Sequence, residues 1–85
     1  AAIRHQIIDS YATTLHRAIE AAEGQPREWV EAAGSSDTFA FLTATELAEA
    51  GAELEAVIEK WRDRGGGDRA GAEAVHLIVH AVRRP

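Results

Sequence analysis

The stretch that decides the fold is TATELAEAGAELEAVIEKWRDR, residues 43–64. Its first and fourth residues, Thr43 and Glu46, have the Ser/Thr-x-x-Glu spacing of a capping box, in which each side chain accepts a hydrogen bond from a backbone N–H left free at the start of a helix. One glycine and four apolar residues then recur at spacings of four and three residues, which places them on one stripe of a helix. They are Leu47, Gly51, Leu54, Ile58 and Trp61. The stretch therefore predicts an amphipathic helix from Thr43 to Arg64.

Charge and glycine content support this helix. Glutamates occupy its first turns and basic residues its last ones, which is the order that the helix macrodipole favours, and the glycines at 65–67 end it. Gly51, in the middle of the stripe, costs about 1 kcal/mol of helix propensity relative to alanine. It is either a neutral replacement in an Ala-rich helix or a point of close approach for a backbone or an aromatic ring, such as that of Trp29, Phe39 or Phe41.

A second long helix is predicted from Ile3 to Glu23. Its apolar residues share one side at helical spacing; they are Ile7, Ile8, Tyr11, Leu15, Ala18, Ile19 and Ala22. Gly24 ends this helix, and Pro26 marks the break. A long amphipathic helix at this position either continues an upstream element or packs on a twin from a second subunit.

Two further stretches predict β-strands. Residues 38–42 (TFAFL) are rich in aromatic and β-branched types, and residues 74–82 (AVHLIVHAV) alternate with apolar residues on both faces. Residues 28–32 are either a short edge strand or a helical turn. The sequence therefore predicts an α+β fold of two layers, in which two long helices pack on a small two- or three-stranded sheet.

Length and composition limit the class of protein. The 85 residues predict one domain, residues 1–85, with a net charge of −5 and no cysteine. The negative charge argues against this domain holding a nucleic-acid backbone by itself. The absence of cysteine excludes disulfides and thiolate metal sites. No apolar run is long enough to span a membrane, and no secretion signal is visible. We expect a cytoplasmic protein with no cofactor and no bound metal.

The sharpest candidate residues are His76 and His80. They share one face of the predicted strand at a separation of about 13 Å, so one metal ion cannot bridge them. Either both are half-buried histidines of a sheet, or they line a ligand pocket between the sheet and the helix. The other residues predicted to wall such a pocket are Trp61, Phe39, Phe41 and Gly51. No set of nucleophile, base and orienting group is visible, so the sequence does not predict an enzyme.

Several motifs in the second half resemble a known family. They are Leu42-Thr43 with Glu46, then Trp61-Arg62-Asp63-Arg64, then Val75-His76-Leu77 with His80-Ala81. Together they resemble the C-terminal region of actinobacterial ArsR-like winged-helix transcriptional regulators. The resemblance covers residues 38–85 well and residues 1–23 loosely. It departs from the family pattern at Ala44, where a proline often follows the capping threonine, and in lacking the cysteine ligands of the metal-sensing branch.

The resemblance implies a C-terminal dimerisation and effector domain. Its DNA-binding winged-helix domain would lie upstream of Ala1, so the protein would contact DNA only through that domain. The implied partners are a second subunit in a homodimer and a small-molecule effector, with no membrane. The alternative function is a small-molecule or metal-binding domain that uses His76 and His80.

Overall fold

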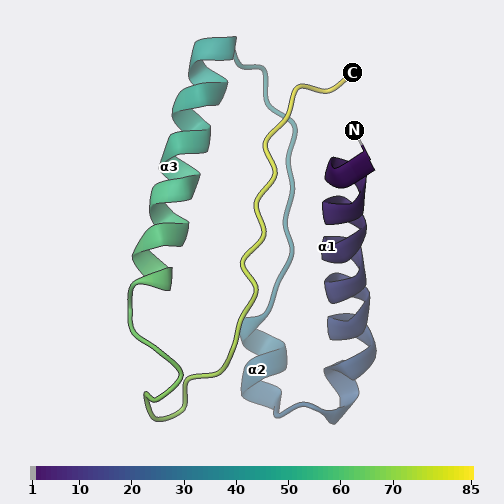
Figure 1. Ribbon diagram of the computed structural model, residues 1–85, viewed down its shortest axis with the longest axis vertical. Helices are drawn as coiled ribbons and strands as arrows, with labels where there is room; N and C mark the ends of the chain where they lie inside the picture. The colour runs from purple at the N-terminus through teal and green to yellow at the C-terminus, as the bar shows by residue number, and fades with distance from the viewer. Residues whose placement is uncertain (1) are drawn as a thin grey trace. The chain divides into compact units, whose positions relative to one another are not determined.

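The computed structural model describes residues 2–85, and all of its regular structure is helical (Figure 1). The elements are α1, Ala2–Ala21; the 3-10 helix η1, Ala22–Gly24; α2, Arg27–Ala32; and α3, Ala44–Arg62. The chain divides into two compact units, Ala1–Thr38 and Phe39–Pro85, which we call unit 1 and unit 2.

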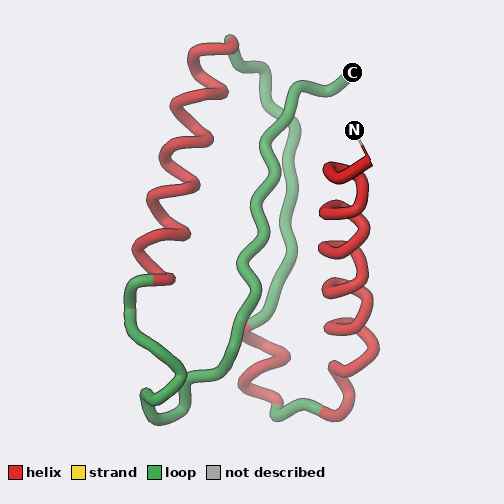
Figure 2. Tube along the Cα trace, viewed as in Figure 1, coloured by secondary structure: helices red, strands yellow, loops and turns green. Residues whose placement is uncertain are grey.

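The predicted α+β fold is wrong. None of residues 2–85 belongs to a β-strand, and Figure 2 shows the two predicted strands, residues 38–42 and 74–82, as loop. Residues 28–32, for which a strand was one alternative, lie in α2. Aromatic and β-branched residues favour extended backbone, but a strand also requires a neighbouring strand that completes a hydrogen-bond ladder. Neither segment acquires one among the described residues, so the predicted sheet is absent.

Unit 1 begins with the predicted first helix. The α-helix ends at Ala21, two residues before the predicted end at Glu23, and continues into η1, which ends at Gly24. The N–H of Gln25 donates to the carbonyl oxygen of Ala22 at 3.2 Å, which closes this turn. Pro26 then starts α2, since its carbonyl accepts hydrogen bonds from the N–H groups of Trp29 and Val30 at 3.0 and 3.3 Å. Proline suits this position because the first helical N–H groups need no partner within the helix.

Unit 2 is organised around α3, and the predicted capping box is confirmed. The N–H of Thr43 donates to Oε1 of Glu46 at 2.9 Å, and the N–H of Glu46 donates to Oγ1 of Thr43 at 3.1 Å. The helix ends at Arg62, two residues earlier than predicted, with Asp63 as its C-cap. Figure 1 shows residues 73–85 running back in the direction opposite to α3.

The glycine-rich loop after α3 has a defined conformation. Gly65 adopts a φ of 125°, a backbone conformation that favours glycine. A Cβ placed on Gly65 would lie 2.8 Å from Cδ of Arg69. The guanidinium of Arg69 donates a hydrogen bond to the carbonyl oxygen of Arg64, one of the acceptors just beyond the end of the helix. Arg69 therefore closes the end of α3, and Gly65 leaves room for its side chain.

Neither unit contains a closed hydrophobic core. No residue of the described part of the chain whose exposure is defined is buried, and large apolar side chains are exposed in both units. Phe41 exposes 106% and Phe39 76% of the reference area, and Ile3 and Ile19 of α1 expose 71% and 74%. Because burial of apolar surface is the main force that stabilises folded chains, the helices here depend heavily on local interactions.

We expect Thr43→Ala to weaken α3. Alanine cannot accept the hydrogen bond from the N–H of Glu46, and loss of such a cap costs about 0.5–1 kcal/mol at an exposed helix start. The helical circular-dichroism signal, followed during a urea titration, measures this change in the free energy of unfolding. Thr43→Ser is the matched control, since serine retains the hydroxyl oxygen and should keep the helix content of the original protein.

The capping box also predicts that the stability of α3 depends on pH. Hydrogen bonds from the backbone N–H of Thr43 and then from its side chain lower the pKa of the Glu46 carboxyl. A lowered pKa in the folded state stabilises the helix above the ordinary glutamate pKa of about 4.3, and this contribution is lost as pH falls through the folded value. Glu46→Gln keeps an oxygen acceptor but does not titrate. The helix content of the original chain should therefore fall more steeply between pH 6 and pH 3 than that of Glu46→Gln, and parallel titrations would contradict this role.

Candidate functional site

The six residues that the sequence singles out all lie in unit 2. They are Phe39 and Phe41 before α3, Gly51 and Trp61 within α3, and His76 and His80 on the C-terminal segment. Gly51 is half-buried, and the other five are exposed. Their role in ligand binding stays a prediction, and their contacts are described in turn below.

Two cations lie over the indole ring of Trp61 at the end of α3. Nζ of Lys60 is 5.4 Å from the centroid of the indole ring, and the guanidinium carbon of Arg64 is 4.9 Å from it. Cation–π contacts of this kind contribute about 0.5–1 kcal/mol at exposed sites. The ring nevertheless remains 52% exposed, so a further surface can still cover it.

The two phenylalanines differ in their contacts. The guanidinium carbon of Arg84 lies 4.9 Å from the ring centroid of Phe39, which joins the end of the chain to the start of unit 2. Phe41 is fully exposed. A side chain with this exposure does not form the wall of an enclosed site within unit 2, although it can contact a partner.

Gly51 faces open space. An added Cβ would have no atom within 4 Å once the residue's chain neighbours and the backbone of its own helix are set aside. The interpretation that a backbone or an aromatic ring approaches closely at this position is therefore wrong. The glycine instead leaves a gap in the apolar stripe of α3.

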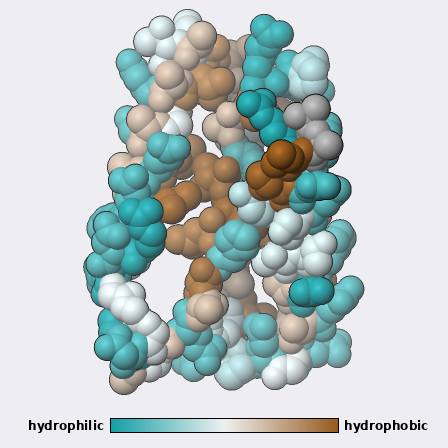
Figure 3. Space-filling model, viewed as in Figure 1, coloured by the Kyte–Doolittle hydropathy of each residue, from teal (hydrophilic) through white to brown (hydrophobic). Residues whose placement is uncertain are grey.

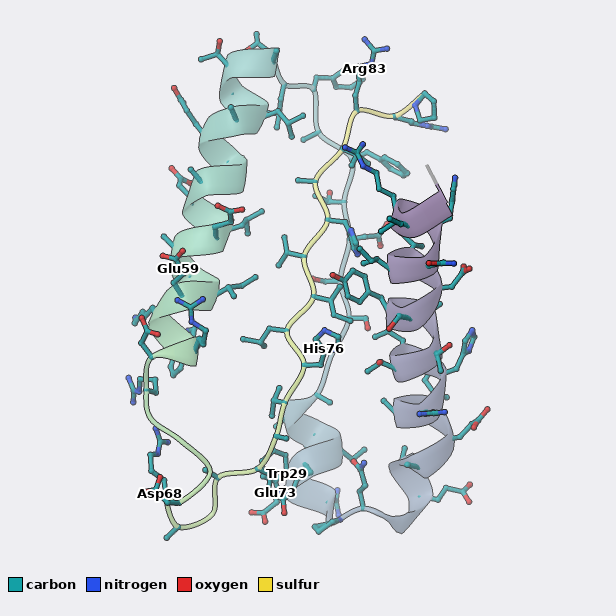
Figure 4. The ribbon with its side chains drawn as sticks, in the orientation of Figure 1. Trp29, Glu59, Asp68, Glu73, His76 and Arg83 are labelled. Carbon is teal, nitrogen blue, oxygen red and sulfur yellow. The ribbon has the colours of Figure 1, made fainter. Side chains whose placement is uncertain are left out.

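The two histidines lie on the exposed C-terminal segment. The side chain of His76 points away from α3 in Figure 4. Both His76 and His80 interact with neighbouring groups. Among residues 2–85 there is no group of three or more His, Cys, Asp or Glu side chains arranged to hold a metal ion.

A second stripe of α3, which sequence reasoning missed, shares Leu54 and Trp61 with the predicted stripe and differs from it by including Val57. It consists of Ala50, Leu54, Val57 and Trp61, and we call it the outer stripe. Val57 exposes 54% of its reference area, and the shared residues Leu54 and Trp61 expose 40% and 52%, whereas Ala50 is half-buried, like Leu47, Gly51 and Ile58 of the predicted stripe. The spacings of four, three and four residues could have revealed it, because they also fit one helix face. Figure 3 shows apolar side chains gathered between α3 and residues 73–85, whereas the outer edge of unit 2 along α3 is mostly hydrophilic.

The charges of α3 are separated along the helix. Residues 44–59 contain five glutamates and no basic residue, whereas Lys60 and Arg62 follow immediately and Arg64 lies just beyond the helix. Arg62 pairs with Asp63, with Nε 3.2 Å from Oδ1. The helix is therefore acidic over most of its length and basic at its C-terminal end.

The chain matches no protein-family model, no curated protein and no solved structure. Within residues 2–85, no helix combines the length and the apolar character needed to cross a lipid bilayer.

Proposed function

We propose that this chain is the dimerisation and effector domain of a bacterial transcriptional regulator that resembles the ArsR-like winged-helix proteins. The motifs around Thr43, Trp61 and His76 support this proposal, together with a long amphipathic helix at the start of the chain. In this proposal the protein is cytoplasmic and has no enzymatic activity, and its DNA-binding domain lies upstream of Ala1.

The observation that carries the proposal is the exposed apolar surface within each unit. Large apolar side chains are exposed in both; they include Ile3 and Ile19 of unit 1 and Phe39, Phe41, Val57 and Trp61 of unit 2. Because burial of apolar surface is the main force that stabilises folded chains, association with another protein surface that covers these side chains would stabilise the chain.

The proposed role follows from symmetry and charge. A domain with a net charge of −5 is poorly suited to hold DNA by itself. As a dimerisation domain it would hold two upstream DNA-binding domains at the spacing of two half-sites. A small molecule that bound one dimer geometry more tightly than another would then change the affinity for DNA.

Two observations test this proposal: the coding sequence upstream of Ala1, and the association state of the full-length protein. We expect the coding sequence upstream of Ala1 to encode a helix-turn-helix, and the full-length protein to sediment as a dimer. The upstream DNA-binding domain alone, without residues 1–85, should sediment as a monomer. It should bind an operator with two half-sites at least tenfold more weakly than the full-length protein does. An upstream sequence without a helix-turn-helix, or a full-length protein that stays monomeric, would contradict the proposal.

A further inference from the structure

We infer that α3 packs antiparallel against α3 of a second copy of this chain, with the outer stripe Ala50, Leu54, Val57 and Trp61 as the contact. The inference rests on the proposed dimerisation and names the surface that carries it. Three properties of the helix support it: its exposed apolar area, the sizes of its side chains, and the positions of its charges.

The outer stripe has the spacing of a helix-pairing seam. Apolar residues at intervals of four, three and four keep facing a partner helix over about three turns, as positions a and d do in a coiled coil. Leu54, Val57 and Trp61 are 40–54% exposed in the single chain. These exposed apolar side chains would be covered by a partner helix that packs along the stripe.

The sizes of the side chains favour an antiparallel arrangement. When Leu54 lies opposite Val57 of the second copy, Ala50 lies opposite Trp61, so that a small side chain faces a large one at each end. On one flank of the same alignment, Gly51 lies opposite Ile58. The open space at Gly51 can therefore accept the larger side chain. A parallel alignment would instead place Trp61 against Trp61 and Ala50 against Ala50, which combines a clash with a cavity.

The charges lead to the same alignment and identify a second copy as the occupant. On the other flank of the antiparallel pair, Glu53 lies opposite Lys60 of the second copy, and the twofold axis repeats this pair. The basic end of each helix then lies beside the acidic part of its partner. The two helix macrodipoles are also opposed, which is favourable. A helix with this charge separation is therefore complementary to an antiparallel copy of itself.

Sedimentation equilibrium of the 85-residue chain and four variants tests the inference. Val57→Glu places a charge in the seam and should raise the dimer dissociation constant at least tenfold. Lys60→Glu places like charges opposite each other and should raise it about threefold or more. The double variant Glu53→Lys/Lys60→Glu restores opposite charges and should return the constant toward the original value. Glu59→Lys, on the opposite side of α3, is the matched control and should leave association unchanged.

The outcomes separate the seam from the proposed function. Circular dichroism of each variant at low concentration first establishes that α3 still forms. If the chain dimerises and Val57→Glu associates as tightly as the original, dimerisation stands and the α3 seam is wrong. If Val57→Glu weakens the dimer but the charge swap fails to recover the effect of Lys60→Glu, the antiparallel alignment is wrong. If the 85-residue chain is monomeric at millimolar concentration and the full-length protein is also monomeric, both the seam and the proposed function are wrong.

Discussion

Replacement of Gly65 by alanine should destabilise the end of α3 by about 2 kcal/mol, the largest effect on helix stability that we expect from a single substitution in this chain. Two physical causes combine. The φ of 125° at Gly65 is a conformation that residues with a Cβ rarely adopt. The added Cβ would also lie 2.8 Å from Cδ of Arg69, so the arginine would have to move away from the carbonyl oxygen of Arg64. Amide hydrogen exchange in residues 59–64 measures the resulting loss of protection.

Gly67→Ala is the matched control for this substitution. No atom lies within 4 Å of a Cβ added at Gly67, and its φ is not in the positive range. It should therefore leave exchange in α3 unchanged. Arg69→Ala should reproduce only part of the Gly65→Ala effect, because it removes the hydrogen-bond donor without straining the backbone. Equal protection in Gly65→Ala and Gly67→Ala would show that the loop conformation does not stabilise the helix.

Replacement of Gly51 by alanine should stabilise α3 by about 1 kcal/mol, the largest stabilisation of the helix that we expect from a single substitution. Glycine in the interior of a helix costs about this much relative to alanine, because it gives up more backbone freedom on folding. Nothing within 4 Å obstructs the added methyl group. Thermal unfolding followed by circular dichroism measures the change, at concentrations low enough for the chain to be monomeric.

Ala52→Gly is the reverse substitution one residue along the same helix. It should destabilise α3 by about the amount that Gly51→Ala stabilises it, also about 1 kcal/mol. If Gly51→Ala instead destabilised the monomeric chain, the space beside Gly51 would be occupied, contrary to the structure. The two substitutions together therefore separate helix propensity from packing at this position.

The helices could be predicted because their determinants are local in the chain. The hydrogen bonds between Thr43 and Glu46 join residues three apart, so the sequence spacing alone predicts the start of α3. The end of α3 was predicted less well. The helix ends at Arg62 with Asp63 as C-cap, because the chain adopts a turn before it reaches the first of the three glycines. The turn is completed by Arg69, whose contribution has no signal in the local pattern.

The exposed face of α3 could not be predicted from the sequence. The stripe from Leu47 to Trp61 is apolar, as expected, but periodicity cannot show which side of an apolar face the chain itself covers. Two neighbouring stripes, one through Gly51 and one through Val57, satisfy the same spacing. Only the structure shows that the stripe through Val57 is the more exposed one. The role of His76 and His80 in binding stays a prediction.

The sequence by itself determined where α1 and α3 form, how α3 is capped, and which faces of the two helices are apolar. These properties depend on residues three or four apart, which meet in any helix. Only the tertiary structure decided the state of residues 38–42 and 74–82, because a strand exists through hydrogen bonds to another segment and not through its own side chains. It also decided that no described residue with a defined exposure is buried in either unit. That exposed apolar surface is the basis of the proposed dimer, and it depends on which segments pack together.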